Sequence, residues 1–130
     1  MALGQKGAGV IVREPLASGI LSGKYAPSHE FPKDDHRRRW GLEKREDDWQ
    51  KVQLVKKTLK AKDAFLSKAA LEFTLGYETV STVIPGAKTR SQVLQNVAAS
   101  LQPDLGREDI DRLEALYIRE EIFRKGLNPR

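Results

Sequence analysis

The chain contains no cysteine among its 130 residues. This absence excludes disulfides, thiolate nucleophiles and cysteine-ligated metals, and it leaves the redox state of the compartment undetermined. Histidine is scarce as well, because only His29 and His36 occur, seven residues apart and without a third ligand pattern. A metal site needs more ligands than two such histidines supply. The sequence therefore predicts no metal site.

Long apolar runs are also missing. No stretch approaches the roughly 20 consecutive apolar residues that a membrane-spanning helix needs. The N-terminal stretch MALGQKGAG has no extended apolar core, so the sequence does not predict a secretory signal. Hydrophobic residues make up 39% and charged residues 32% of the chain, a balance typical of a globular protein. We therefore expect a cytoplasmic protein without a membrane segment.

The positive charge of the chain is concentrated in one region. The formal net charge is +5, and residues 51–68 hold six lysines against one aspartate, Asp63. Because this segment also has a helical pattern, we interpret its lysines as the solvent-facing side of a helix. A basic nucleic-acid binder stays open as an alternative, although the interleaved aromatic residues typical of such sites are absent. The six are Lys51, Lys56, Lys57, Lys60, Lys62 and Lys68.

Two short runs rich in β-branched residues predict strands, one from Gly9 to Val12 and one from Thr79 to Ile84. The first is continuously apolar, which is typical of a parallel strand buried on both faces. Pro15 ends this strand, and Pro85 and Gly86 turn the chain after the other.

Helical patterns fill most of the remaining chain after a long polar connection. Residues 15–25 predict a loop with about one helical turn, and residues 26–46 predict a further loop of mixed charge, long enough to suggest function or mobility. Apolar residues then recur at helical spacing in four segments. The predicted helices run from about Asp47 to Leu59, from about Phe65 to Gly76, from Thr89 to near Pro103, and from about Arg107 to Arg124.

The third predicted helix begins with a capping-box pattern. Thr89 is followed three residues later by Gln92, a spacing at which each side chain bonds the backbone amide of the other residue. An exposed helix N-terminus of this kind also attracts anions, because its amides are unpaired and carry partial positive charge. An ordinary capped helix and a phosphate site are both compatible with this pattern.

The predicted order is strand, loop, two helices, strand and two helices. A helical crossover between two strands implies a parallel pair. A complete (β/α)8 TIM barrel needs eight strands and about 250 residues, so this chain is too short for one. We therefore predict an α/β fold that is an incomplete barrel, with two parallel strands plus about four helices.

Four stretches carry a resemblance to the aldo-keto reductase family, in the branch that includes potassium-channel β-subunits and bacterial NADP-dependent reductases. PLASGILSGKY at residues 15–25 resembles the loop after the seventh barrel strand, and FPKDDHRR at residues 31–38 is similar to a stretch that often follows it. STVIPGAKTRSQVLQN at residues 81–96 resembles the eighth strand and its helix, and LGREDIDRLEAL at residues 105–116 the closing helix. The resemblance implies that residues 1–130 are one partial domain, the NADP-binding C-terminal part of the barrel. It also implies that this part is a fragment of a larger barrel.

The resemblance also implies NADP(H) as the bound partner and names the residues that hold it. The first loop would line the pyrophosphate, largely through backbone, with Lys24 approaching from the same loop. Gly86 and Lys88 would hold the 2′-phosphate, with Gln92 and Asn96 on the adenine and ribose side. Gln95 stands where the family usually has Glu, so an acceptor is kept and a charge is lost. The residues of the first loop are Pro15, Leu16, Ala17, Ser18 and Gly19.

Simple physical chemistry is compatible with this assignment. Gly86 has no Cβ, so a ligand can approach the backbone closely. Lys88 adds a positive charge that favours a phosphorylated ribose over a bare one. Taken alone, Lys24 and Lys88 are ordinary surface lysines, and Gln92 has its capping role as the simpler explanation. One carboxamide cannot fully serve both a cap and a cofactor.

The family's catalytic tetrad of Asp, Tyr, Lys and His lies on earlier strands, and no stretch here matches those contexts. We therefore predict no catalytic residue and a chain that is inactive alone, although its family is one of NADP-dependent carbonyl oxidoreductases. A non-catalytic nucleotide-binding or protein-interaction module is the alternative. The two predicted strands would leave open edges and apolar faces, so self-association or helices wrapped around the strands is also expected.

Overall fold

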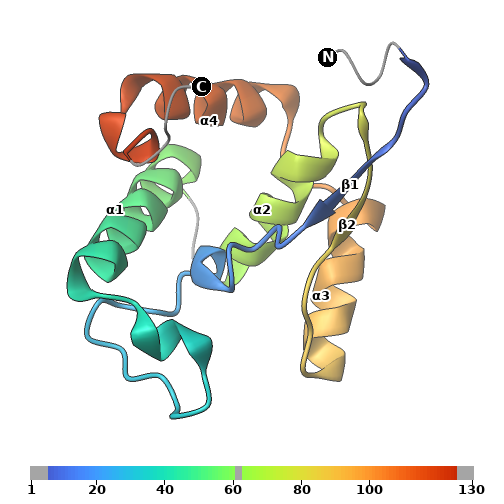
Figure 1. Ribbon diagram of the computed structural model, residues 1–130. Coiled ribbons are helices and arrows are strands. Elements are labelled where there is room, and N and C mark those ends of the chain that lie inside the picture. The colour runs from blue at the N-terminus through green and yellow to red at the C-terminus, as the bar shows by residue number, and fades with distance from the viewer. Residues whose placement is uncertain (1–5, 61–62, 126–130) are drawn as a thin grey trace.

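The structure is a computed structural model that describes residues 6–60 and 63–125. Two strands and four α-helices make up the described fold (Figure 1). In chain order they are β1 (Val10–Arg13), α1 (Leu42–Leu59), α2 (Asp63–Leu75), β2 (Val80–Ile84), α3 (Arg90–Leu101) and α4 (Arg107–Arg119). Short 3-10 helices lie at Ile20–Ser22, His36–Arg39 and Glu121–Phe123.

The two strands pair in parallel, which confirms the predicted α/β arrangement with a helical crossover. Val12 pairs with Val83 and Arg13 with Ile84, while an irregularity in the register falls between Val10 and Ile11. Gly9 lies so close to β2 there that an added Cβ would overlap the Ser81 hydroxyl. A glycine before β1 therefore lets the two backbones approach.

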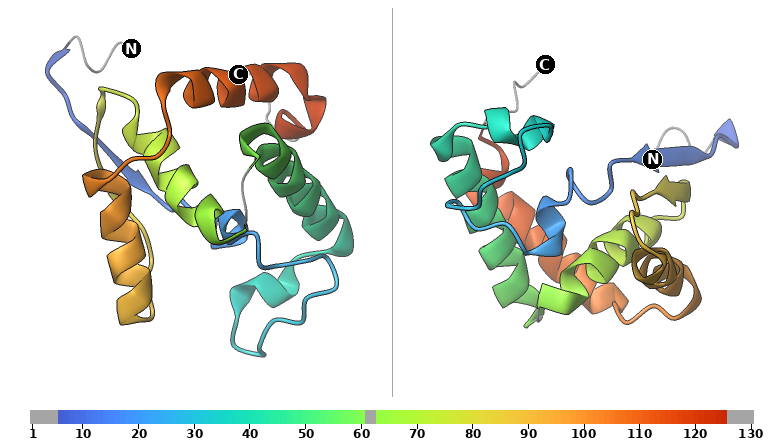
Figure 2. Two further views of the ribbon diagram at one scale, coloured as in Figure 1. Left: turned by 180° about the vertical axis from the view of Figure 1, so that it is seen from behind. Right: turned by 90° about the horizontal axis from the view of Figure 1, so that it is seen from below.

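The prediction that the first strand is buried on both faces was wrong. Helices cover one face of the strand pair and leave the other open (Figure 2). Ile11 is 63% exposed and Ile84 60% exposed, while their neighbours Val12 and Val83 are half-buried. An apolar strand run indicates burial somewhere, but two strands with helices on one side cannot bury both faces.

The core is built around α2, which lies between the strand pair and α1 (Figure 1). Leu66, Ala69 and Leu71 of this helix are each at most 2% exposed. The helix contacts β2, α3 and the 3-10 helix Ile20–Ser22. The predicted stripe on this helix is therefore confirmed at Leu66 and Ala69, while Ala70 and Phe73 are half-buried.

Two helix boundaries differ from those expected. α1 begins at Leu42 rather than near Asp47, because the mixed charges pair along the helix, with Lys44 Nζ 2.6 Å from the Asp48 carboxylate. α4 ends at Arg119 rather than at Arg124. Glu120 takes an extended conformation, after which the 3-10 turn brings Phe123 against the Tyr117 ring, 6.2 Å between centroids.

A buried carboxylate joins α2 to the connection between α3 and α4. Glu72 is 4% exposed, and its Oε2 accepts the amides of Asp104 at 3.1 Å and Leu105 at 2.9 Å. Its Oε1 lies 3.1 Å from Lys68 Nζ, which also donates to the Gln102 carbonyl at 2.6 Å and to the Asp104 carboxylate. The hydrogen bond to Asp104 is the main reason that the pKa of Lys68 is raised.

This arrangement corrects the interpretation of the basic segment as one solvent-facing helix side. The segment divides into α1 and α2, with Lys60 in a left-handed conformation at the end of α1. Lys68 is engaged by carboxylates, and Lys62 lies outside the described residues.

The apolar stripe of α3 does not enter the core. Val93, Val97 and Leu101 are between 47% and 73% exposed, and Leu94 beside them is 60% exposed. α3 instead contacts α2, and Ala99 is its buried residue. A helical stripe was correctly predicted, but the described residues provide nothing that covers it.

Candidate cofactor site

The two loops predicted to hold a cofactor leave the same edge of the strand pair. Because β1 and β2 are parallel and Arg13 pairs with Ile84, both carboxyl ends lie side by side. Ligands of α/β sheets bind outside the carboxyl ends of the strands. A cofactor site is therefore expected at the edge from which these loops depart.

The loop after β1 has a strained backbone. Ala17, Ser18 and Gly19 follow one another with φ values of 48°, 56° and 86°, and Glu14 has a φ of 55°. Left-handed conformations are costly for residues other than glycine and persist where surrounding structure enforces them. Backbone amides bind an anion only where they are unpaired and point to the same side, so the free amides of this loop decide what it can hold.

Several amides of this loop are already used. Ala17 donates to the Glu14 carbonyl at 2.9 Å, and Gly19 donates to the Leu16 carbonyl at 2.9 Å. Within the described residues the amides of Leu16 and Ser18 make no hydrogen bond, so these two are the ones available to a ligand. Pro15 is buried and Lys24 is exposed.

Arg37 anchors the strained loop, a role that the sequence did not reveal. Its Nη1 donates to the Ser18 carbonyl at 2.9 Å, and its Nε and Nη2 donate to the two carboxylate oxygens of Asp35 at 2.9 and 2.6 Å. The guanidinium also lies 4.5 Å from the ring centroids of Tyr25 and Phe31. The hydrogen bonds from Arg37 hold the pKa of Asp35 well below its usual range.

The predicted long loop is organised around this arginine. Phe31 is buried, and His29 contacts the Tyr25 and Phe31 rings at centroid distances of 4.9 and 4.8 Å. His36 contacts the Trp40 ring at 5.8 Å. Both histidines therefore have packing partners, and within residues 6–60 and 63–125 no cluster of three potential metal ligands occurs.

The loop after β2 is closed by the predicted capping box, which the structure confirms. The Gln92 amide donates to Thr89 Oγ1 at 3.2 Å, while Gln92 Oε1 accepts the amides of Lys88 at 2.6 Å and Thr89 at 3.2 Å. Asn96 Nδ2 donates to the Gly86 carbonyl at 3.4 Å. These bonds fix the loop on the first turns of α3.

The side chains expected to contact the cofactor remain open to solvent here. Lys88 and Gln95 are exposed, and an added Cβ at Gly86 would meet no atom within 4 Å. No packing within the protein therefore requires a glycine at this position. In the first turn of α3, the amides of Arg90 and Ser91 have no acceptor among the described residues, as is usual for a helix N-terminus.

The two parallel strands and four helices are consistent with a portion of a (β/α)8 barrel, with the loops after both strands at one edge. The chain matches the family model described as "Aldo/keto reductase family" over residues 1–118. It therefore belongs to the aldo/keto reductase family, whose members are oxidoreductases that use nicotinamide cofactors.

A curated relative agrees with this assignment. The chain is 32% identical over 120 residues to "Probable voltage-gated potassium channel subunit beta" of Oryza sativa subsp. japonica. The alignment covers 85% of this chain and 35% of the rice protein, so the chain spans about a third of the relative it matches. No helix in the described part of this chain is both long and apolar enough to cross a bilayer.

Proposed function

We propose that residues 1–130 form one partial aldo/keto reductase domain that binds the phosphate groups of NADP(H), in the cytoplasm, and supplies no catalytic residue itself. The observation that carries this proposal is the parallel pairing of β1 and β2, which brings both loops to one edge. Phosphate sites after the seventh and eighth strands are common in barrels of this type.

Each predicted residue has a defined part in this proposal. The free amides of Leu16 and Ser18 bind the pyrophosphate, in a turn shaped by Pro15, Ala17 and Gly19, and Lys24 approaches the same group. Gly86 and Lys88 receive the 2′-phosphate at the N-terminus of α3. Because Gln92 Oε1 is bound by the cap, its Nε2 is the atom left for the adenosine. The remaining contacts on the adenine and ribose side come from Gln95 and Asn96.

Replacing Lys88 by alanine should weaken NADP binding about tenfold while changing NAD binding little. Only NADP has the 2′-phosphate, and losing one hydrogen bond to a charged group has this effect. Calorimetric titration of both cofactors into the wild-type and variant chains measures the difference. Lys57→Ala, at an exposed lysine on α1, is the matched control and should change neither affinity.

An equal loss for NADP and NAD in Lys88→Ala would contradict the assigned role of Lys88. If neither cofactor released or absorbed heat on titration, the proposal that the isolated chain binds a cofactor would be contradicted. The same preparation, mixed with NADPH and an aldehyde, should not oxidise the cofactor. Oxidation at a rate proportional to the chain concentration would contradict the proposal that the chain lacks catalytic residues.

A non-catalytic nucleotide-binding module is the second candidate, favoured by loops that are ordered without any matched tetrad residue. Tyr25 packs on Arg37, Tyr77 donates to Glu114 and Tyr117 contacts Phe123. This candidate would be favoured if the chain bound NADP but reduced no aldehyde, both alone and after the missing barrel strands of a relative were added. Aldehyde reduction after that addition would instead favour a part of a reductase.

We also propose that the chain self-associates through its uncovered apolar surface. Ile11 and Ile84 on the sheet and Leu101 on α3 are each at least 60% exposed. Light scattering should give a mass above that of the 14.6 kDa chain, and Leu101→Lys should lower it. Gln50→Lys, at an exposed polar position on α1, should not. A monomer in the wild type would contradict self-association.

A further inference from the structure

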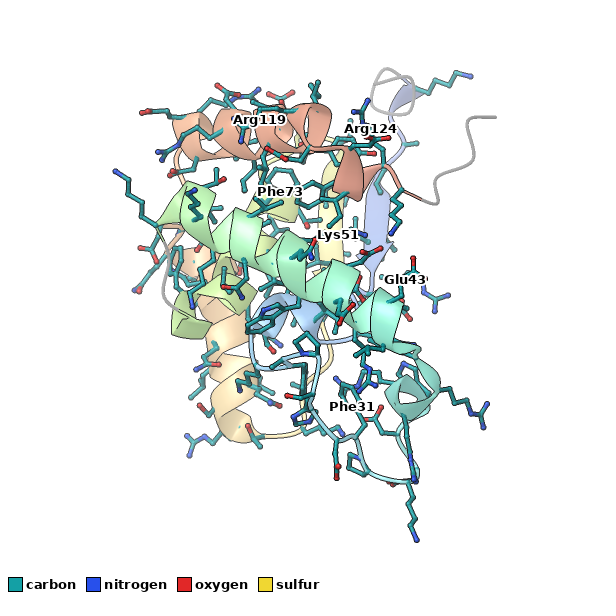
Figure 3. The ribbon with its side chains drawn as sticks, turned by 90° about the vertical axis from the view of Figure 1, so that its left-hand side faces the viewer. Phe31, Glu43, Lys51, Phe73, Arg119 and Arg124 are labelled. Atoms are coloured by element: carbon teal, nitrogen blue, oxygen red, sulfur yellow. The ribbon has the colours of Figure 1, made fainter. Side chains whose placement is uncertain are left out.

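A large apolar pocket lies between α1, α2 and α4, with Pro15 and Leu21 of the loop after β1 also in its wall. Its volume is about 590 Å³, within the range of small-molecule sites. Phe73 points from α2 toward the space between α1 and α4 (Figure 3). Aliphatic and aromatic side chains from all three helices and the turn after α4 form most of the wall. They include Leu59, Leu66, Phe73, Leu113, Tyr117 and Phe123.

Among the described residues that line this pocket, Glu114 is the one with a charged side chain. It is half-buried, and the Tyr77 hydroxyl donates to its Oε1 at 2.7 Å. In the part of the chain that the structure describes, it has no other hydrogen-bond donor and no ion-pair partner. Arg107, whose charge acts on the Tyr77 hydroxyl, is paired with Asp111 at 2.9 Å instead. A carboxylate in apolar surroundings without a countercharge is unfavourable, so the pocket is complementary to a cation.

Two other polar side chains of the pocket, Thr74 and Tyr77, already make hydrogen bonds. Thr74 Oγ1 donates to the Ala70 carbonyl at 2.9 Å within α2. Burial, assisted by Glu114, raises the pKa of Tyr77 to about 12, so its hydroxyl stays protonated and remains the donor at neutral pH. Recognition of a charged ligand group in this pocket therefore falls to Glu114, because Tyr117, the remaining polar side chain of the described lining, offers a hydroxyl rather than a carboxylate.

We infer that the pocket binds a primary alkylamine, with its hydrocarbon chain among the apolar side chains and its ammonium group on Glu114. The ammonium supplies the missing countercharge and donates to the carboxylate oxygen that Tyr77 leaves free. Aromatic rings such as Tyr77 and Tyr117 attract a cation placed over their faces. An alkyl carboxylate would be repelled by Glu114, and an alcohol would leave its charge unpaired. This inference does not rest on the proposed NADP site, although Pro15 belongs to both linings.

Titration with decylamine, decanol and decanoate at neutral pH tests this inference. Decylamine should bind most tightly, and methyl resonances of Leu59, Leu66 and Leu113 should shift on its addition. Glu114→Gln should weaken decylamine binding about tenfold or more and leave decanol binding unchanged, because one hydrogen bond to a charged group is lost. Glu108→Gln, at an exposed glutamate of the same helix outside the pocket, is the control and should bind as the wild type does.

A variant that fills the pocket gives a second test. Ala70→Phe should abolish binding of all three probes while circular dichroism shows that the helices are kept. If this variant does not fold, comparing decylamine binding in Glu114→Gln and Glu108→Gln still tests the inference. Equal affinities for the three probes, unchanged decylamine binding in Glu114→Gln, or no saturable binding at all would overturn the inference.

Discussion

Replacing Glu72 by alanine is expected to lower the free energy of unfolding by about 3 kcal/mol, the range for breaking a buried, hydrogen-bonded charge. The substitution removes the acceptor of two amides, those of Asp104 and Leu105. It also removes a side chain of a residue that is only 4% exposed, which leaves a cavity. Unfolding in urea, followed by circular dichroism, measures the change.

Two further variants make this test specific. Glu72→Gln keeps an oxygen for both amides but loses the charge opposite Lys68, so it should destabilise less than alanine does. Glu78→Ala, at an exposed glutamate just after α2, should change stability by no more than about 0.5 kcal/mol. A loss below about 1 kcal/mol in Glu72→Ala would show that the connection between α3 and α4 is held by other contacts.

Replacing Arg37 by methionine should destabilise the chain by about 2 kcal/mol and loosen the loop after β1. Methionine retains apolar contact with Tyr25 and Phe31 but loses the cation–π attraction and the charged hydrogen bond to Ser18. The strained conformations of residues 17–19 then lose their anchor. Hydrogen exchange at the Gly19 and Leu21 amides should accelerate, and urea unfolding gives the stability.

Arg38 provides the matched control, because it is the next residue and is exposed. Arg38→Met should leave both exchange and stability within error of the wild type. Unchanged exchange at Gly19 in Arg37→Met would mean that the loop holds its own conformation. The hydrogen bonds from Arg37 lower the pKa of Asp35 in the folded chain. The Arg37–Asp35 pair therefore stabilises the fold above the usual carboxyl pKa of 3.8, and this stabilisation is lost only at lower pH.

Local signals predicted much of this fold. Thr89 and Gln92 are three residues apart, so their capping box could be identified without any tertiary information. The β-branched runs gave both strands within one residue at each end, and Gly76 marked the end of α2. Each of these features depends on neighbours in the chain, which a sequence displays directly.

The contacts that shape the site lie across longer separations. Arg37 reaches Ser18 over 19 residues, and Glu72 reaches Asp104 over 32. The sequence does show that Asp35 stands two residues before Arg37, so a local ion pair between them could be predicted. Nothing in this mixed-charge run indicates that Arg37 also donates to the Ser18 carbonyl. Exposure of Ile11 was missed for a related reason, since a hydrophobic pattern indicates a buried face without identifying the partner that buries it.

The orientation of the Gln92 side chain decides whether donors or acceptors face solvent at the loop after β2. With its oxygen turned inward onto two amides, the side chain presents only N–H groups to the outside. A molecule arriving there must offer lone pairs, as the ring nitrogens of a purine do. Exchanging this residue for glutamate would keep the inward bonds and reverse the preference, so that a partner rich in N–H groups would be selected instead.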